Sequence, residues 1–195
     1  MKVEHSNIKT LFTTLIALGA IAACAAATPP LLEDYSDSRT NKLGGTRHQF
    51  DDKSAGSKSQ ATLHCENGVL KVKGELMPGR GVPAFISVAS LLSADGKPGD
   101  LSGYTGIRLR VKVTKGILSV QVSSADVTNF DFHSSAPVAG KPGEFKDVRI
   151  AFKDLKRSWS PQTALNLKSA TSINLVSFGM EKGAFAYEVD ELGFY

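Results

Sequence analysis

A basic face alternates with an apolar face in the stretch "GYTGIRLRVKV" (103–113). Arg108 and Arg110 occupy one side of this period-two pattern, and the apolar residues next to them occupy the other. Guanidinium groups bind carboxylate and hydroxyl oxygens through several N–H groups at once. In "GILSVQVSS", Gln121 falls on the polar side in the same way. These three side chains are candidates for a hydrogen-bonding ligand site; the alternative is a solvated strand face.

The stretch "NFDFHSS" (129–135) is a second candidate. If its two phenylalanines face the core, Asp131 and His133 share the opposite face, where either can hydrogen-bond a sugar hydroxyl. If that face belongs to the same sheet as the arginines and Gln121, the combined surface can recognise polyol or carboxylate groups. Trp159 is the only tryptophan and can supply the aromatic platform of a sugar site. The alternatives are a solvated strand face and a loop tryptophan that covers the core.

No motif in the chain indicates catalysis. A nucleophile elbow, an H-E-x-x-H pair, a C-x-x-C pair and EF-hand spacing are all absent from the sequence, and its four histidines are not paired at metal-ligand spacing. We therefore expect a binding protein that is not an enzyme and has no cofactor. A hydrolase with dispersed catalytic residues is a less favoured alternative, because triads assemble in space rather than in sequence.

The first residues are typical of an export signal. "MKVEHSNIKT" precedes an apolar run of about a dozen residues, too short to span a bilayer. "IAAC" resembles a bacterial lipobox, which predicts a signal peptide over 1–23, lipid modification of Cys24, a tether over 24–30 and a globular domain over 31–195. Cleavage after Ala27 also fits the small-residue rule. We expect a protein anchored by lipid at the bacterial cell envelope; a soluble secreted protein is the alternative.

Composition argues against a nucleic-acid partner. The 195 residues carry a formal net charge of +4, and basic residues are interleaved with acidic ones, as in "EFKDVRIAFKDLKRSW". Nucleic-acid binders gather basic charge into one patch instead. Cleavage at Cys24 leaves Cys65 as the second and last cysteine, so we expect no internal disulfide. We expect Cys65 to be a small buried apolar residue.

Short strand-like segments separated by Gly and Pro turns make up the rest of the chain. "SQATLHCEN" and "GVLKVKGEL" are joined by Asn67-Gly68, a strong hairpin signal. "INLVSFGM" is apolar on both faces, which is typical of a covered strand in mid-sheet. Helical periodicity is weak, with short turns expected at "VASLLSAD" and "FKDLKRSW". The pattern predicts an all-β domain, either a β-sandwich or a jelly roll.

Three stretches in the second half carry a family resemblance. "DLSGYTGIRLRVKV", "FDFHSSAPVAGKPGEFKDVRIAFKDLKRSW" and "SINLVSFGMEKGAFAYEVDELGFY" follow the order of motifs in the complex I intermediate-associated protein family. Phe145 stands where that family usually has tryptophan. The chain resembles this family over residues 32–195. The resemblance implies a galactose-binding-like jelly-roll β-sandwich, similar to family 11 carbohydrate-binding modules.

The resemblance also implies a role without catalysis. It favours a carbohydrate or another envelope component as the ligand, bound on a polar sheet face. The alternative is an assembly factor or scaffold that contacts a membrane protein complex, as mitochondrial members do. In related carbohydrate-binding sandwiches the two ends of the chain often share a structural calcium, for which Asp34 and Asp190 are the natural oxygen ligands. Ordinary surface carboxylates are the other interpretation, and the sequence leaves the metal open.

Overall fold

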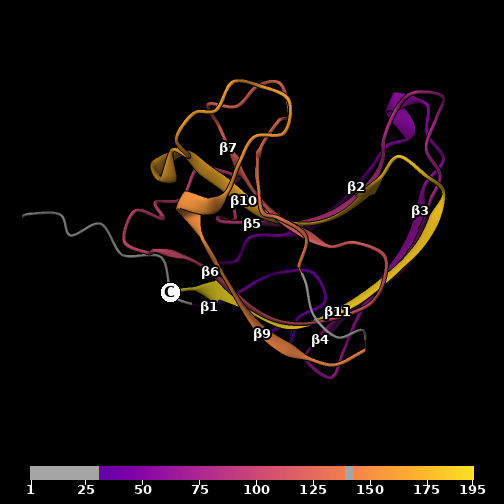
Figure 1. Cartoon of the computed structure of the whole chain (residues 1–195). Helices are drawn as coiled ribbons and strands as arrows, with labels where there is room; N and C mark the ends of the chain where they lie inside the picture. Colours follow the sequence, from indigo (N-terminus) through magenta and orange to yellow (C-terminus); the bar gives the residue numbers. More distant parts are fainter. Residues whose placement is uncertain (1–30, 139–142) are drawn as a thin grey trace, which may run out of the picture.

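β-Strands in two antiparallel sheets make up most of the structure, a computed structural model that describes residues 31–138 and 143–195 (Figure 1). The predicted signal peptide, Cys24 and the tether lie outside these residues. The six-stranded sheet has the order β3-β4-β11-β6-β9, with β1 beside β11: β1 (Leu31–Glu33), β3 (Gln60–Glu66), β4 (Val69–Leu76), β6 (Gly106–Lys115), β9 (Lys146–Ala151) and β11 (Gly183–Phe194). The five-stranded sheet has the order β2-β5-β10-β7-β8: β2 (Arg47–Asp51), β5 (Ala84–Leu91), β7 (Ser119–Ser124), β8 (His133–Ser134) and β10 (Ala170–Gly179).

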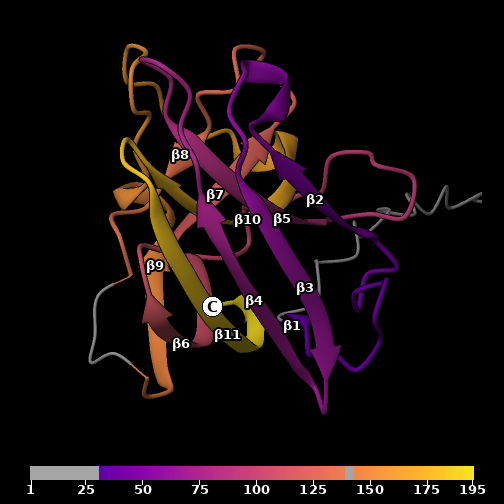
Figure 2. The same cartoon turned by 90° about the vertical axis from the view of Figure 1, so that its right-hand side faces the viewer.

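The two sheets lie one above the other, with the core between them (Figure 1). In Figure 2 the edge strands β2 and β3, one from each sheet, face the viewer. Alternation decides which side chains enter the core. In β6, Ile107, Leu109 and Val111 are fully buried, as their spacing predicts. In β7, Val120 and Val122 point into the same core from the other sheet.

The predicted hairpin at Asn67-Gly68 is confirmed. It joins β3 to β4, and both turn residues have positive φ, 52° and 74°. Two left-handed residues in a two-residue loop give the backbone twist that antiparallel strands need. The predicted turn at "VASLLSAD" holds only for its second half. Val88–Leu91 belong to β5 and pair with β10, and a turn follows in which Gly96 N donates to Ser93 O at 3.4 Å. The segment "FKDLKRSW" contains η2 (Phe152–Asp154), and two further 3-10 turns are η1 (Lys53–Ala55) and η3 (Leu167–Ser169).

A buried ion pair ties the two sheets together near the start of the described chain. Arg47 Nε on β2 lies 2.8 Å from Glu33 Oε1 on β1, with the two side chains 7% and 0% exposed. Ser90 Oγ also donates to Glu33 Oε1, and Arg47 lies over the Tyr35 ring. Arg47 Nη2 donates to the backbone oxygens of both Asp37 and Thr40. These contacts offset the cost of burying two charges.

The described residues contain no helix long and apolar enough to span a membrane. Every α-helical or 3-10 element assigned in them is a three-residue 3-10 turn.

Candidate functional site

Arg108 and Arg110 lie on the outward face of the six-stranded sheet, which we call the charged face. Arg108 pairs with Glu191, and Arg110 Nε lies 3.0 Å from Asp190 Oδ2. The neighbouring Lys112 pairs with Glu188 at 2.6 Å and is the least exposed of the three basic side chains. Each of these three cations therefore already has a carboxylate partner on the adjacent strand β11.

Gln121 lies on the other sheet. It belongs to β7, and its side chain leaves the five-stranded sheet on the face opposite to the core residues Val120 and Val122. The outward face of the five-stranded sheet, which we call the open face, and the charged face point in opposite directions. The hydrophobic core separates them, and packed sheets lie about 10 Å apart. The structure thus does not combine Gln121 with Arg108 and Arg110 in one surface.

Asp131 and His133 are buried, and Phe130 is 77% exposed, the reverse of the predicted alternation. His133 pairs with Val122 in the β7–β8 ladder and points to the core side, where its Nε2 lies 2.8 Å from the Thr163 oxygen. The Asp131 carboxylate accepts backbone N–H groups of a neighbouring turn instead of facing solvent. The reason for the reversal is the positive φ of Phe130, 61°, which breaks strand geometry just before β8.

Trp159 lies on that neighbouring turn and is 71% exposed. The Asp131 carboxylate accepts hydrogen bonds from the backbone nitrogens of Ser158 (2.8 Å), Trp159 (3.0 Å) and Ser160 (2.6 Å). Burial raises the pKa of Asp131, but these hydrogen bonds outweigh it and hold the pKa below its usual value. Asp131 therefore positions Trp159 and is not itself available to a ligand.

A row of side chains crosses all five strands of the open face. The cross-strand pairs His48–Ala89, Ala89–Asn174, Asn174–Gln121 and Gln121–Ser134 are directly opposite one another from β2 to β8. Side chains opposite each other on one face lie within about 5.5 Å at Cβ. The row places an imidazole, two carboxamides and a hydroxyl side by side.

The rest of the open face is small, polar, aliphatic or aromatic, and its strand positions carry no Asp, Glu, Lys or Arg. Its strand residues are His48, Phe50, Phe85, Ser87, Ala89, Leu91, Ser119, Gln121, Ser123, Ser134, Ser172, Asn174, Val176 and Phe178. The aromatic side chains gather toward β2, where Phe50 and Phe178 are 54% and 43% exposed. Phe85 lies directly opposite Phe178 in the β5–β10 ladder.

The polar side chains of the open face differ in burial and in whether they already have hydrogen-bond partners. Asn174 is held in place, because its Nδ2 donates to Ser123 Oγ at 2.7 Å and its Oδ1 accepts from Ser172 Oγ at 2.9 Å. Ser119 Oγ is buried and has no partner among the described residues. The Gln121 amide also makes no side-chain hydrogen bond within the described part of the chain. Fixed and free polar groups therefore lie side by side on this face.

Sequence reasoning identified Gln121 and missed the other members of the open face. The available signal was in "INLVSFGM" and the residues before it, where Ser172, Asn174 and Phe178 alternate with Ile173 and Leu175. The predicted covered, mid-sheet position of this strand is confirmed, because β10 is the central strand of its sheet and is mostly buried. Its outward face is mixed rather than apolar, since Ser172 and Asn174 stand there with Val176 and Phe178. The positions of His48 and Phe50 on the open face could not be predicted from the sequence in this way, because their strand β2 is short and mostly exposed.

Asp34 and Asp190, the two candidate calcium ligands, each pair with a cation. The Lys42 ammonium lies 2.5 Å from Asp34 Oδ2, and this hydrogen bond lowers the pKa of Asp34 to about 2. Asp190 pairs with Arg110. Among the residues that the structure describes, no group of three or more His, Cys, Asp or Glu side chains is arranged to hold a metal ion.

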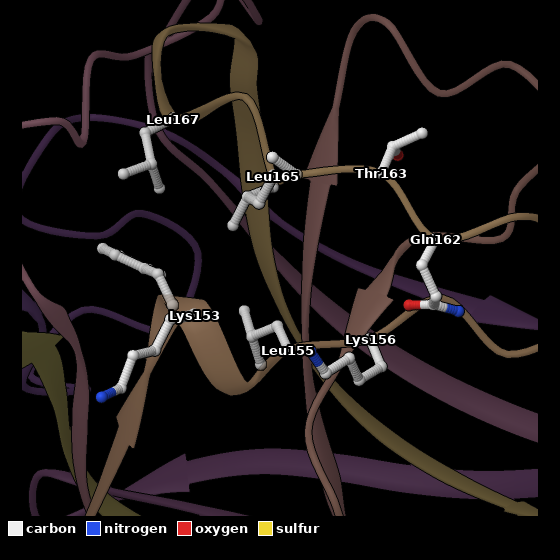
Figure 3. A pocket seen from close by; sticks show the side chains of 9 residues that line it. Lys153, Leu155, Lys156, Gln162, Thr163, Leu165 and Leu167 are labelled. Carbon is white, nitrogen blue, oxygen red and sulfur yellow. The ribbon is translucent and has the colours of Figure 1, made fainter.

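Two pockets lie at the margins of the open face, one lined by Lys156 beside Ser134 and the other by His48. The larger, of about 530 Å³, has a floor of Phe152, Leu155, Leu165 and Leu167, with Lys153 and Lys156 at its rim (Figure 3). The smaller, of about 350 Å³, lies between β2 and β3. It includes Cys65, which is half-buried rather than buried as expected. Burial raises the pKa of the Cys65 thiol, and Arg47 Nη1 lies 3.5 Å from its sulfur.

The architecture is a jelly-roll β-sandwich of the kind found in carbohydrate-binding modules. It is similar to the family 11 carbohydrate-binding module of the cellulase Lic26A-Cel5E from Clostridium thermocellum, with a TM-score of 0.59, 14% identity and coverage of 87% of this chain and 95% of that one. The family 11 module from the same organism in complex with a β-1,3-1,4-mixed-linked tetrasaccharide has a TM-score of 0.57 and 14% identity. That match covers 85% of this chain and 94% of the module. An agarase, AgWH50C, has a TM-score of 0.51 and 12% identity, and the match covers 85% of this chain and 26% of the agarase. At these identities the likeness shows the fold.

The chain belongs to the complex I intermediate-associated protein 30 (CIA30) family, whose sequence pattern matches residues 40–189. No curated protein sequence matches it. The family and the jelly-roll fold confirm both the expected resemblance and the expected all-β class.

Proposed function

We propose that the protein binds a neutral polysaccharide on its open face, without catalysis. The observation that carries the proposal is the uncharged row of hydrogen-bonding side chains across β2, β5, β10, β7 and β8, with aromatic rings toward β2. Sugar hydroxyls both donate and accept hydrogen bonds, as carboxamides and serine hydroxyls do. Exposed aromatic rings provide apolar contact area beside them.

Charge separates this proposal from one that involves an anionic ligand. The strand positions of the open face carry no full charge, and the cation next to the row is the exposed Lys156, which pairs with Ser134 at the β8 end. The middle of the row therefore holds nothing that would neutralise a uronate or phosphate. The charged face has cations, but Arg108, Arg110 and Lys112 are each paired with a carboxylate. A ligand bound by these three side chains would have to break those pairs. The fold similarity to a module solved with a mixed-linked tetrasaccharide supports a glycan as the ligand.

We further propose that the protein is exported and anchored by lipid at Cys24. The basic start, the apolar run and the "IAAC" sequence support this proposal. Acyl chains would hold the binding domain at a membrane surface, at about 0.8 kcal/mol for each buried methylene. The open face would then meet glycans of the cell envelope.

Affinity electrophoresis of the purified protein tests the binding proposal. Gels contain mixed-linked β-1,3-1,4-glucan, xylan, agarose or the anionic polygalacturonate. We expect retardation by at least one neutral polysaccharide and none by polygalacturonate. Phe178→Ala should weaken retardation about three- to tenfold, because it removes an exposed ring from the face. Ile117→Ala is the matched control, since Ile117 is similarly exposed, at 44%, but lies in the β6–β7 turn.

Two outcomes would overturn the proposal. One is unchanged mobility in every neutral polysaccharide. The other is retardation in polygalacturonate that depends on Arg108 and Arg110, which would move the site to the charged face. If the protein instead retains a stoichiometric protein partner from solubilised membranes, the scaffold alternative suggested by the family replaces glycan binding.

A further inference from the structure

Two aromatic side chains project from neighbouring loops at the β8 side of the sandwich. Phe130 is 77% exposed and Trp159 is 71% exposed, the two highest values among the exposed large hydrophobic side chains. Their loops, residues 125–132 and 157–166, rise together above the five-stranded sheet at the upper left of Figure 1. Exposed apolar area of this size is unfavourable in water and marks an interaction site when it is clustered.

The two loops are fastened to each other by a polar network beneath the rings. Besides the three N–H groups bound by the Asp131 carboxylate, Arg157 Nε donates to the Asp131 backbone oxygen at 3.0 Å. Arg157 Nη2 donates to Asn129 Oδ1 at 2.9 Å, and Asn129 Nδ2 donates to Ser160 Oγ at 2.9 Å. Charge-assisted hydrogen bonds of this kind hold a geometry strongly.

Each loop is also held in a defined conformation on its own. Gln162 closes the Trp159 turn, because it accepts from the Arg157 backbone nitrogen at 3.1 Å and donates to the Arg157 oxygen at 2.7 Å. Phe130 has a φ of 61°, in the left-handed region that strains the backbone of a bulky residue. A strained and exposed phenylalanine beside a doubly tied tryptophan is a preorganised surface, and preorganisation lowers the entropic cost of binding.

The Trp159 turn is continuous with the edge of the open face. The backbones of Ser134 on β8 and Lys156 exchange two hydrogen bonds, so the chain leaves the sheet only three residues before Trp159. Ser134 is the last member of the row that crosses the open face. From β2 to β8 the row spans four strand spacings, about 19 Å. Phe50 on β2 and Trp159 beyond β8 therefore lie at the two ends of the row, with Lys156 between Ser134 and Trp159.

We propose that Trp159 and Phe130 form a second aromatic platform, which binds the distal units of a neutral polysaccharide chain that crosses the open face. This inference rests on the proposed function and adds its ligand class, an extended chain rather than a single sugar or a chain end. Continuity with the row favours a glycan over a lipid bilayer, because bilayer insertion needs no fixed ring geometry. Asp131 acts as the positioning residue of the platform.

The test uses the disaccharide, tetrasaccharide and octasaccharide of mixed-linked β-1,3-1,4-glucan, with affinity measured by calorimetry. Trp159→Ala should lower the affinity for the octasaccharide about three- to tenfold and leave the disaccharide unchanged. Gln121→Ala, in the middle of the row, should weaken all three. Ile117→Ala is the control, and circular dichroism checks that each variant is folded.

Tryptophan emission gives a second readout, because Trp159 is the only tryptophan in the chain. The octasaccharide should shift the emission to shorter wavelength and protect the indole from iodide quenching, while the disaccharide should do neither. Asp131→Asn should reduce both effects.

Binding of the octasaccharide with unchanged emission, or with full affinity in Trp159→Ala, would overturn the platform and leave the proposed function standing. Wild-type protein that binds none of the three oligosaccharides would overturn the proposed function for this glucan, and the platform with it. Blue-shifted emission with phosphatidylglycerol vesicles but not with the octasaccharide would replace the glycan with a bilayer.

Discussion

Asn174 on β10 lies directly opposite Gln121 on β7, and both carboxamides leave the sheet on the open face. The two differ in their freedom to bind. Asn174 is occupied by Ser123 and Ser172, whereas Gln121 has no side-chain partner among the described residues. The pair therefore combines a fixed group that shapes the surface with a free group that can meet a ligand.

Replacement of Gln121 tests which face binds. Gln121→Ala should weaken glycan affinity about fivefold to tenfold, because a hydrogen bond contributes about 1 kcal/mol and 1.4 kcal/mol is a factor of ten. The double variant Arg108→Ala and Arg110→Ala should leave affinity unchanged, since both residues lie on the charged face. Calorimetry measures both, and the opposite ranking would place the site on the charged face.

Removal of Arg47 tests the buried ion pair. Arg47→Ala leaves the fully buried Glu33 carboxylate without its cation, which should lower the free energy of unfolding by about 3–5 kcal/mol. Arg110→Ala removes an exposed pair and should cost at most about 1 kcal/mol. Urea unfolding compares the two variants. Equal losses would mean that the buried pair does not hold the sheets together.

Acid titration tests the anchoring of Asp131. Its pKa in the folded protein lies below the ordinary value of 3.8, so its hydrogen bonds stabilise the fold above about pH 4, and this contribution is lost as the pH falls through the folded pKa. Asp131→Asn should be less stable than wild type at pH 7 by about 1–3 kcal/mol and should show a flatter decline in acid. Thermal unfolding from pH 2 to pH 7 measures both curves, and parallel curves would contradict the assignment.

The substitution Gly74→Ala tests how closely β3 and β11 approach β4 at this position. A Cβ there would lie 2.1 Å from the Gln60 oxygen and 2.6 Å from Phe185 Cζ. Gly74→Ala should therefore lower the free energy of unfolding by at least about 1–3 kcal/mol. Gly103→Ala is the matched control, because nothing lies within 4 Å of its Cβ. Similar urea midpoints for the two variants would show that β3 and β11 can move apart.

Substitution of Cys24 tests the predicted anchor. Cys24→Ser should abolish acylation and release the protein from membranes, because no thiol remains to carry the acyl chain. Labelling with a fatty-acid analogue and membrane fractionation provide the readouts, with Cys65→Ser as the control. If Cys24→Ser stays with the membrane, or if the mature chain starts after Ala27, the lipid anchor is excluded.

Local pattern was sufficient for the strands and for their buried sides. Ile107, Leu109 and Val111 could be placed in the core, because alternate side chains of a strand point to the same face of the sheet. The hairpin at Asn67-Gly68 could be predicted because two left-handed residues suit only a few turn types. Alternation shows that a strand has two sides, but it does not show which other strand shares a side. For this reason Gln121 and Arg108 looked equivalent in sequence.

The sequence by itself determined the all-β class, the family resemblance and the apolar core, because these depend on local spacing and on the order of motifs. Only the tertiary structure decided which polar side chains share a surface. Strand order in each sheet arises from pairings between segments far apart in the chain. These pairings place His48 and Gln121 in one row and Arg108 on the opposite face of the sandwich. Likewise, the left-handed residue Phe130 precedes a buried Asp131, which reverses the alternation that the sequence predicts.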